Sequence, residues 1–75
     1  KYGWPDLELF CPSTATKSGN NEAIFIELKA KRGVMNENQR RMRDQIIEAG
    51  FAWALCKSIE DVTAFLTPLV KLKVK

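Results

Sequence analysis

The seven-residue segment from Ala23 to Lys29 constrains the fold more than any other part of this 75-residue chain. It is rich in β-branched and aromatic side chains and therefore predicts a strand. Because side chains alternate between the two faces of a strand, Glu27 and Lys29 share one face with Phe25. Their Cα atoms would lie roughly 6.6 Å apart, two residues along the strand. One face of this strand is therefore expected to end in two opposite charges.

A second strand is predicted shortly before the first. Residues 6–10 alternate polar and apolar side chains, as a strand does, and the segment from Cys11 to Glu22 is rich in Ser, Thr, Gly and Asn, which favours a loop. If the two strands pair as a hairpin, the beginning of the first meets the end of the second. We therefore expect Asp6 to lie close to Glu27 and Lys29.

A helix is predicted after this hairpin. Asn36 suits the N-cap position, and Gln39 follows three residues later at the spacing of a capping box. The helix is expected to run to Ala49 and to end at Gly50. Gln39 falls on the apolar stripe that includes Met42, Ile46 and Ala49, so a polar amide is expected to face the sheet.

The remaining segments complete a small α/β fold. Residues 51–56 predict a third strand that pairs alongside residues 23–29, and Ser58 with Asp61 predicts a cap for a second helix through about Leu66. Residues 71–75 alternate like an edge strand but would equally suit a loose basic tail. Strand, strand, helix, strand and helix in this order predict a small mixed sheet flanked by helices.

Composition excludes several classes of function. The chain contains no histidine, so a Ser-His-Asp triad, a histidine general base and a His-ligated zinc are impossible within it. Cys11 and Cys56 are too few for a four-ligand zinc site, and we interpret them as reduced, partly buried thiols. The apolar runs fall far short of the roughly 20 residues that span a bilayer. We expect a cytoplasmic domain, and no membrane partner.

Size and charge add two expectations. A chain of 75 residues buries only roughly 60% of its unfolded surface, so the core should be thin, and a second copy of the chain could complete it. Residues 1–30 hold three lysines and four acids, which is a net charge of −1. Since the whole chain carries +3, residues 31–75 carry +4. An acidic end beside a basic end suits an enzyme that uses a metal and acts on polyanions.

The expected cluster of Asp6, Glu27 and Lys29 could carry such chemistry. Two nearby carboxylates repel unless a cation lies between them, and oxygen ligands favour hard ions such as Mg²⁺ or Mn²⁺. Such an ion can polarise a phosphoryl oxygen and activate a water, which Lys29 could orient or help to deprotonate. The alternatives stay open: Pro5-Asp6 suits a turn, and Glu27 with Lys29 suits an ordinary exposed pair.

The combination of motifs resembles a known family. The chain contains Gly3-Trp4-Pro5-Asp6, then Ile26-Glu27-Leu28-Lys29, then Gln39 near the start of a helix that ends in Glu48-Ala49-Gly50. This order resembles the VRR-NUC family, the virus-type replication-repair nucleases, which are a branch of the PD-(D/E)XK nuclease superfamily. The resemblance extends from Gly3 to about Leu66 and is typical of a stand-alone phage or bacterial member.

The resemblance implies a restriction-endonuclease-like core and a Mg²⁺- or Mn²⁺-dependent deoxyribonuclease. Asp6, Glu27 and the backbone carbonyl of Leu28 would hold the metal. Lys29 would serve the attacking water, and Gln39 would position the site or the DNA backbone. In contrast, Gln39 taken by itself suits a capping-box partner of Asn36, a role compatible with a place in the site.

The resemblance also implies DNA as the partner. The expected substrate is branched DNA, such as a four-way (Holliday) junction. A homodimer with two-fold symmetry would suit such a junction, and the expected role is in DNA repair. Phosphate contacts are expected from five basic residues: Lys31, Arg32, Arg40, Arg41 and Arg43. The three arginines equally suit a solvated helix face. The alternative function is a non-catalytic module that binds nucleic acid or assists assembly.

The chain departs from the family in one respect. Family members usually begin with a helix that bears an additional acidic residue, followed by a strand, before the Gly-x-Pro-Asp segment. Nothing in residues 1–75 corresponds to these elements. We therefore expect residues 1–75 to form a single VRR-NUC-like nuclease domain that lacks its N-terminal helix and strand.

Overall fold

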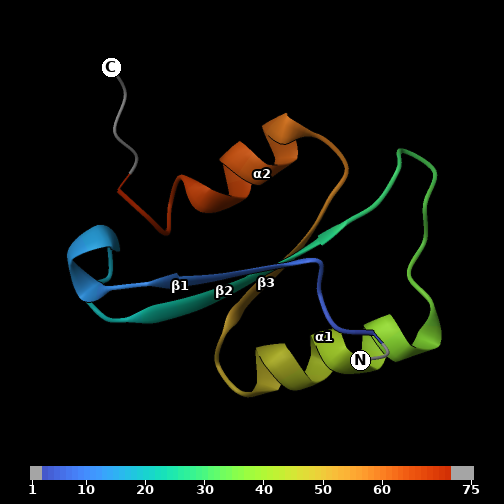
Figure 1. The fold of residues 1–75 in the computed structure, drawn as a ribbon, viewed down its shortest axis with the longest axis horizontal. Coiled ribbons are helices and arrows are strands. Elements are labelled where there is room, and N and C mark those ends of the chain that lie inside the picture. The colour runs from blue at the N-terminus through green and yellow to red at the C-terminus, as the bar shows by residue number, and fades with distance from the viewer. Residues whose placement is uncertain (1–2, 72–75) are drawn as a thin grey trace.

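A three-stranded mixed sheet lies between two helices in the computed structural model, which describes residues 3–71. Figure 1 shows α1 on one face of the sheet and α2 on the other. The elements are β1 (Leu7–Cys11), a short 3-10 helix η1 (Ser13–Ala15), β2 (Glu22–Leu28), α1 (Glu37–Glu48), β3 (Ala52–Cys56) and α2 (Ile59–Leu66). The predicted α/β fold with its small mixed sheet is confirmed.

The strand order is β1-β2-β3, so the segment with the strongest strand pattern is central. β1 runs antiparallel to β2, with Leu7 opposite Ile26. β3 runs parallel to β2, with Leu28 opposite Cys56, as expected for a strand reached through a helical crossover. Each predicted strand is confirmed to within one residue at either end.

The face of the sheet that α2 covers holds the main apolar core. Ile24, Ile26 and Cys56 are each exposed by 1% or less. Val62 and Phe65 of α2 pack against them. The period-2 alternation of β2 therefore places its aliphatic side chains on this face and leaves Phe25 and Glu27 for the other.

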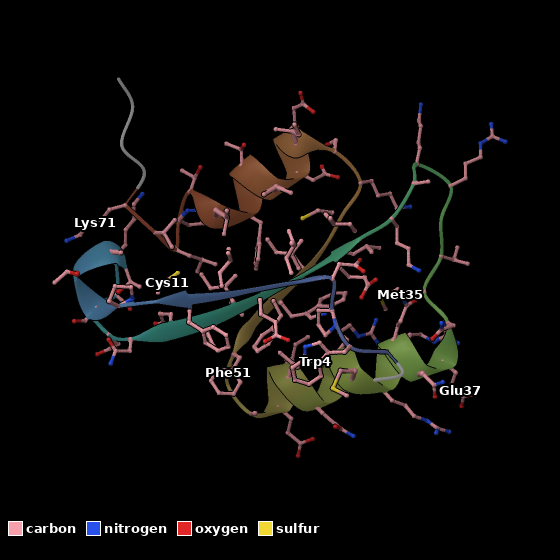
Figure 2. The ribbon with its side chains drawn as sticks, in the orientation of Figure 1. Trp4, Cys11, Met35, Glu37, Phe51 and Lys71 are labelled. Carbon is pink, nitrogen blue, oxygen red and sulfur yellow. The ribbon has the colours of Figure 1, made fainter. Side chains whose placement is uncertain are left out.

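The face that α1 covers is aromatic. Phe25 is buried, and the rings of Trp4 and Phe51 meet it edge-on with centroids 5.8 and 5.9 Å away. Figure 2 shows Trp4 and Phe51 on the α1 side of the sheet. Ile46 is buried from the helix side. Glu27 shares this face with the rings and is therefore held in an apolar layer.

Helix α1 begins as the sequence predicts. The side chain of Asn36 accepts a hydrogen bond from the backbone N–H of Gln39, and the Gln39 side chain accepts one from Asn36, which completes the capping box. The prediction that Ala49 faces the core is wrong: Ala49 is exposed because the helix ends there and the chain turns away at Gly50 with φ +91°.

The loop between β1 and β2 contacts the segment after α2. Thr16 is buried, and its hydroxyl donates to the carbonyl of Asn20 at 2.6 Å. Thr16 also pairs with Val70 in an isolated bridge, and the N–H of Lys71 donates to Ala15 at 2.9 Å. The rest of the basic segment 71–75 lies outside the described residues. Between residues 3 and 71, no helix has the length and apolar character needed to cross a membrane.

Candidate active site

Asp6 lies directly beside the end of β2. Because Leu7 is opposite Ile26, the antiparallel register places Asp6 opposite Glu27. The Asp6 carboxylate accepts a hydrogen bond of 2.8 Å from the backbone N–H of Leu28. The hairpin thus brings Asp6 and Glu27 together, as the order of the two strands predicts.

Glu27 is a buried carboxyl group. It is only 2% exposed, and its Oε2 accepts a hydrogen bond of 3.0 Å from the side-chain amide of Gln39. Burial raises the pKa of Glu27 to about 7, and the hydrogen bond with Asp6 and the Asp6 charge add to this shift, whereas the charge of Lys29 opposes it. The surroundings of Glu27 therefore favour its protonated form more than water does.

Gln39 is fixed in both position and orientation. Its Oε1 accepts from the backbone N–H of Asn36 at 3.0 Å, and its Nε2 donates to Glu27 at 3.0 Å. Since a backbone N–H can only donate, the amide of Gln39 can only present its NH₂ group to Glu27. The capping role and the place in the site thus coexist in one side chain.

Lys29 follows directly after β2 and is half-buried. Its backbone N–H donates to the carbonyl of Cys56 at 3.1 Å, which extends the parallel pairing by one residue. Its charge lowers the pKa of Glu27, so the ammonium lies within electrostatic reach of that carboxyl group. Within residues 3–71, the ammonium forms no ion pair. It can therefore contact a bound water or phosphate.

Gly3 holds the segment that carries Asp6 directly against α1. Its φ is +77°, and a Cβ atom at this position would lie 2.2 Å from the carbonyl oxygen of Asn38 and 2.8 Å from the nitrogen of Gln39. Only glycine fits this contact with the first turn of α1. Sequence reasoning missed this contact, although Gly3 is part of the motif Gly3-Trp4-Pro5-Asp6.

The predicted DNA-binding residues divide into two groups. Lys31 and Arg32 lie in the exposed turn after β2, and their side chains make no hydrogen bond or ion pair with residues 3–71. The other three lie on α1, and their side chains bond to other partners, whereas Gln39 of that helix bonds to Glu27. Because the turn comes shortly after Lys29, it is the basic segment that is nearest to the site in sequence.

Each of the three arginines on α1 already has a partner. The guanidinium of Arg40 donates to the carbonyl of Met35 at 2.6 Å, which fastens the loop before the helix. Figure 2 shows Met35 beside the start of α1. Arg41 pairs with Glu37 at 2.9 Å, and both side chains are about 70% exposed. Arg43 pairs with Asp44 at 2.9 Å and also lies over the ring of Trp53.

The atoms of the site that could bind a metal ion are all oxygens. Within residues 3–71, no group of three or more His, Cys, Asp or Glu side chains converges, so the protein offers the carboxylates of Asp6 and Glu27 and nearby backbone carbonyls. Such a set fits a hard divalent cation that keeps several waters, as Mg²⁺ does. Zinc, which prefers nitrogen and sulfur, fits it poorly.

Comparison with known proteins assigns the family. A family model described as VRR-NUC domain matches residues 1–60. The chain belongs to the VRR-NUC domain family. The VRR-NUC match includes the carboxyl pair, Lys29, Gln39 and all five predicted DNA-binding residues. No curated protein and no solved structure matches the chain significantly.

Membership of the VRR-NUC family makes this a nuclease domain and DNA its partner. Nucleases of this family typically use divalent metals, and the oxygen donors of Asp6 and Glu27 are compatible with such ions. The small mixed α/β fold is consistent with a PD-(D/E)XK-like nuclease core. The family therefore agrees with the chemistry that the carboxyl pair suggests.

Proposed function

We propose that this VRR-NUC domain is a metal-dependent endonuclease that hydrolyses DNA phosphodiester bonds. The observation that carries the proposal is the convergence of the Asp6 and Glu27 carboxyl groups at the end of β2. The burial of Glu27 first, and then its closeness to Asp6, raises its pKa to about 7. A cation between the two groups offsets both effects.

Three groups of the chain would hold Mg²⁺ or Mn²⁺: the two carboxylates and the backbone carbonyl of Leu28. The N–H of Leu28 points to Asp6, and the N–H and C=O of one strand residue point to the same side, which supports a role for this carbonyl. When bound, the cation supplies polarisation of a phosphoryl oxygen and a water of lowered pKa.

The other side chains have roles in proton transfer and positioning. Lys29 is close enough to Glu27 to affect its pKa, and it would orient the attacking water or offset the negative charge that develops on the phosphate. Gln39 would hold Glu27 in place through its NH₂ group, which donates to Oε2. Burial of Glu27 keeps bulk water from competing for these hydrogen bonds.

Branched DNA is the substrate class that we propose, with a homodimer as the active form. Two sites related by a two-fold axis suit the paired scissile strands of a four-way junction, and this assignment would place the protein in DNA repair in a bacterial or phage-infected cytoplasm. The DNA backbone would contact five residues, Lys31, Arg32, Arg40, Arg41 and Arg43. The exposure of the turn after β2 supports this placement.

The test is cleavage of a labelled four-way junction and of a linear duplex by the full chain, with Mg²⁺, Mn²⁺ or EDTA. Glu27→Ala should abolish cleavage while the protein stays folded. Glu48→Ala is the matched control, because Glu48 is an exposed acid at the far end of α1. Cleavage that persists in Glu27→Ala or in EDTA would overturn the mechanism. Binding of the junction without cleavage by the unmodified protein would instead favour a non-catalytic module. Equal cleavage of the duplex would overturn the selectivity for branched DNA.

A further inference from the structure

A cavity of about 370 Å³ opens at the carboxyl ends of β2 and β3, beside the candidate active site. Lys29, the predicted partner of the attacking water, lines it together with Lys57 and Ser58. Its apolar lining includes Leu28 and Val62. The cavity is therefore a hollow with a cationic rim that shares Leu28 and Lys29 with the site and lies toward α2.

Lys29 and Lys57 lie side by side because β2 and β3 are parallel. Leu28 is opposite Cys56, and the bond from Lys29 N–H to the Cys56 carbonyl continues this register by one residue. Neighbouring strands lie only about 4.8 Å apart, so two lysines leave the sheet next to one another. Like charges at neighbouring positions of two strands repel each other and destabilise the sheet. An anion that binds both lysines relieves this repulsion.

Lys57 also bonds to the basic turn that follows β2. Its Nζ donates a hydrogen bond of 3.1 Å to the backbone carbonyl of Lys31. An ammonium group has three donors, so two remain for a ligand. The bond holds the turn that carries Lys31 and Arg32 close to Lys57, and all three side chains are exposed. Four cations thus gather where the parallel strands end.

The acids near Lys57 do not neutralise this cluster. The Asp61 carboxylate accepts from the backbone N–H of Lys57 at 2.9 Å, and the Asp61 N–H donates to the Ser58 hydroxyl, so this acid caps the start of α2. Within residues 3–71, no acid forms an ion pair with Lys57, whereas Arg41 and Arg43 of α1 each have one. A phosphate at Lys57 therefore displaces no existing ion pair.

We propose that Lys57 binds a backbone phosphate of the DNA that neighbours the scissile phosphate, so that the bound strand continues from Lys29 across the ends of β2 and β3. This inference rests on the proposed function, because it takes DNA as the ligand and the Asp6–Glu27 pair as the point of cleavage. Lys31 and Arg32 hold the same stretch of backbone from the adjoining turn.

The test measures how the affinity for a labelled four-way junction depends on salt, in EDTA so that the DNA stays intact. The logarithm of the association constant falls as the logarithm of the salt concentration rises, and each phosphate contact makes this slope steeper by about 0.9. Lys57→Gln should lower the slope by about 1 and weaken binding several-fold at the lowest salt. Lys17→Gln is the matched control, because Lys17 is an exposed lysine in the β1–β2 loop at the opposite end of the sheet. This control should keep the full slope.

Lys57→Arg keeps the positive charge and a donor for the Lys31 carbonyl, so it tests whether a cation at this position carries the salt dependence. Restoration of the slope in Lys57→Arg supports the proposal. An unchanged slope in Lys57→Gln, an equal loss in Lys17→Gln, or a lowered slope that Lys57→Arg does not restore would overturn it. Failure here is distinct from failure of the proposed function: a protein that cleaves DNA with metal but keeps its slope in Lys57→Gln loses only the role of Lys57.

Discussion

The side-chain amide of Gln39 donates a hydrogen bond of 3.0 Å to the carboxyl group of Glu27. The same amide accepts from the backbone of Asn36, so the N-cap of α1 and the candidate active site form one network. The start of a helix thereby fixes the orientation of a buried acid on the neighbouring strand. A change at this helix terminus should therefore affect catalysis as well as stability.

Gln39→Ala and Asn36→Ala should separate these two effects. Each removes half of the capping box, so each should cost about 1 kcal/mol of stability. Gln39→Ala alone removes the amide that donates to Glu27, and it should lower kcat at least about tenfold, which corresponds to roughly 1.4 kcal/mol. Asn36→Ala keeps the backbone N–H that orients Gln39. Urea unfolding and junction cleavage measure the two quantities, and an equal loss of kcat in both variants would assign the effect to the cap alone.

The stability of the metal-free protein should fall as pH rises toward neutrality. Burial first, and then Asp6, raises the pKa of Glu27 from 4.5 to about 7. The unfolded chain releases this proton near pH 4.5, whereas the folded protein keeps it until about pH 7, so the folded state binds more protons between these values. The contribution of Glu27 to stability therefore declines over this window, by at most about 3 kcal/mol, and is constant above it.

Glu27→Gln tests this dependence. A glutamine resembles protonated Glu27, since it can donate to Asp6 and accept from Gln39. The variant should lack the decline between pH 4.5 and 7 and should be more stable than the unmodified protein at pH 8, while it loses cleavage. Urea unfolding at several pH values in EDTA measures the effect. A decline of the same size in Glu27→Gln would show that other groups cause it.

Local sequence patterns predict much of this fold. The alternation in β2 correctly places Ile24 and Ile26 on one face and Phe25 and Glu27 on the other, because a strand has a period of two. The capping box at Asn36 is also local and is confirmed. The pairing of Asp6 with Glu27 follows from the order of the strands, since a hairpin joins the end of one to the beginning of the next.

Other features depend on contacts that no local pattern encodes. The 2% exposure of Glu27 results from packing against α1, whereas an E-x-K sequence alone equally suits an exposed pair. The bond from Lys57 to the Lys31 carbonyl joins residues 26 positions apart through the parallel register. The exposure of Ala49 depends on where the chain leaves the helix. These properties arise from the tertiary arrangement of the elements.

The two cysteines should react with thiol reagents at different rates. Cys56 is 1% exposed in the core, and burial, followed by the charge of Asp61, raises the pKa of its thiol. Cys11 is only partly buried at the end of β1, and Figure 2 shows it on the α2 side of the sheet. Because the thiolate is the reactive form, native protein should be labelled at Cys11 first and at Cys56 only on unfolding. Mass spectrometry of timed samples checks the order, and rapid labelling of Cys56 in native protein would contradict it.

Gly3→Ala should impair the active site through a backbone contact, and Gly19→Ala provides the matched control. Both glycines have φ near +80°, so an L-alanine costs about 1–2 kcal/mol of backbone strain at either position. A Cβ atom at Gly19 meets nothing within 4 Å, whereas one at Gly3 meets the backbone of Asn38 at 2.2 Å. Since backbone atoms cannot rotate away, the segment that carries Asp6 must shift from the first turn of α1.

This shift should weaken the alignment of Asp6 with Glu27 and should lower both cleavage and the affinity for Mn²⁺ at least about tenfold. Gly19→Ala should lose only stability. Isothermal titration with Mn²⁺ and junction cleavage, each at a temperature where urea unfolding shows both variants to be folded, compare the two. If Gly3→Ala binds Mn²⁺ and cleaves as well as Gly19→Ala, the contact between Gly3 and α1 contributes only to folding. A specific loss in Gly3→Ala would instead show that the contact sets the distance between the two carboxyl groups.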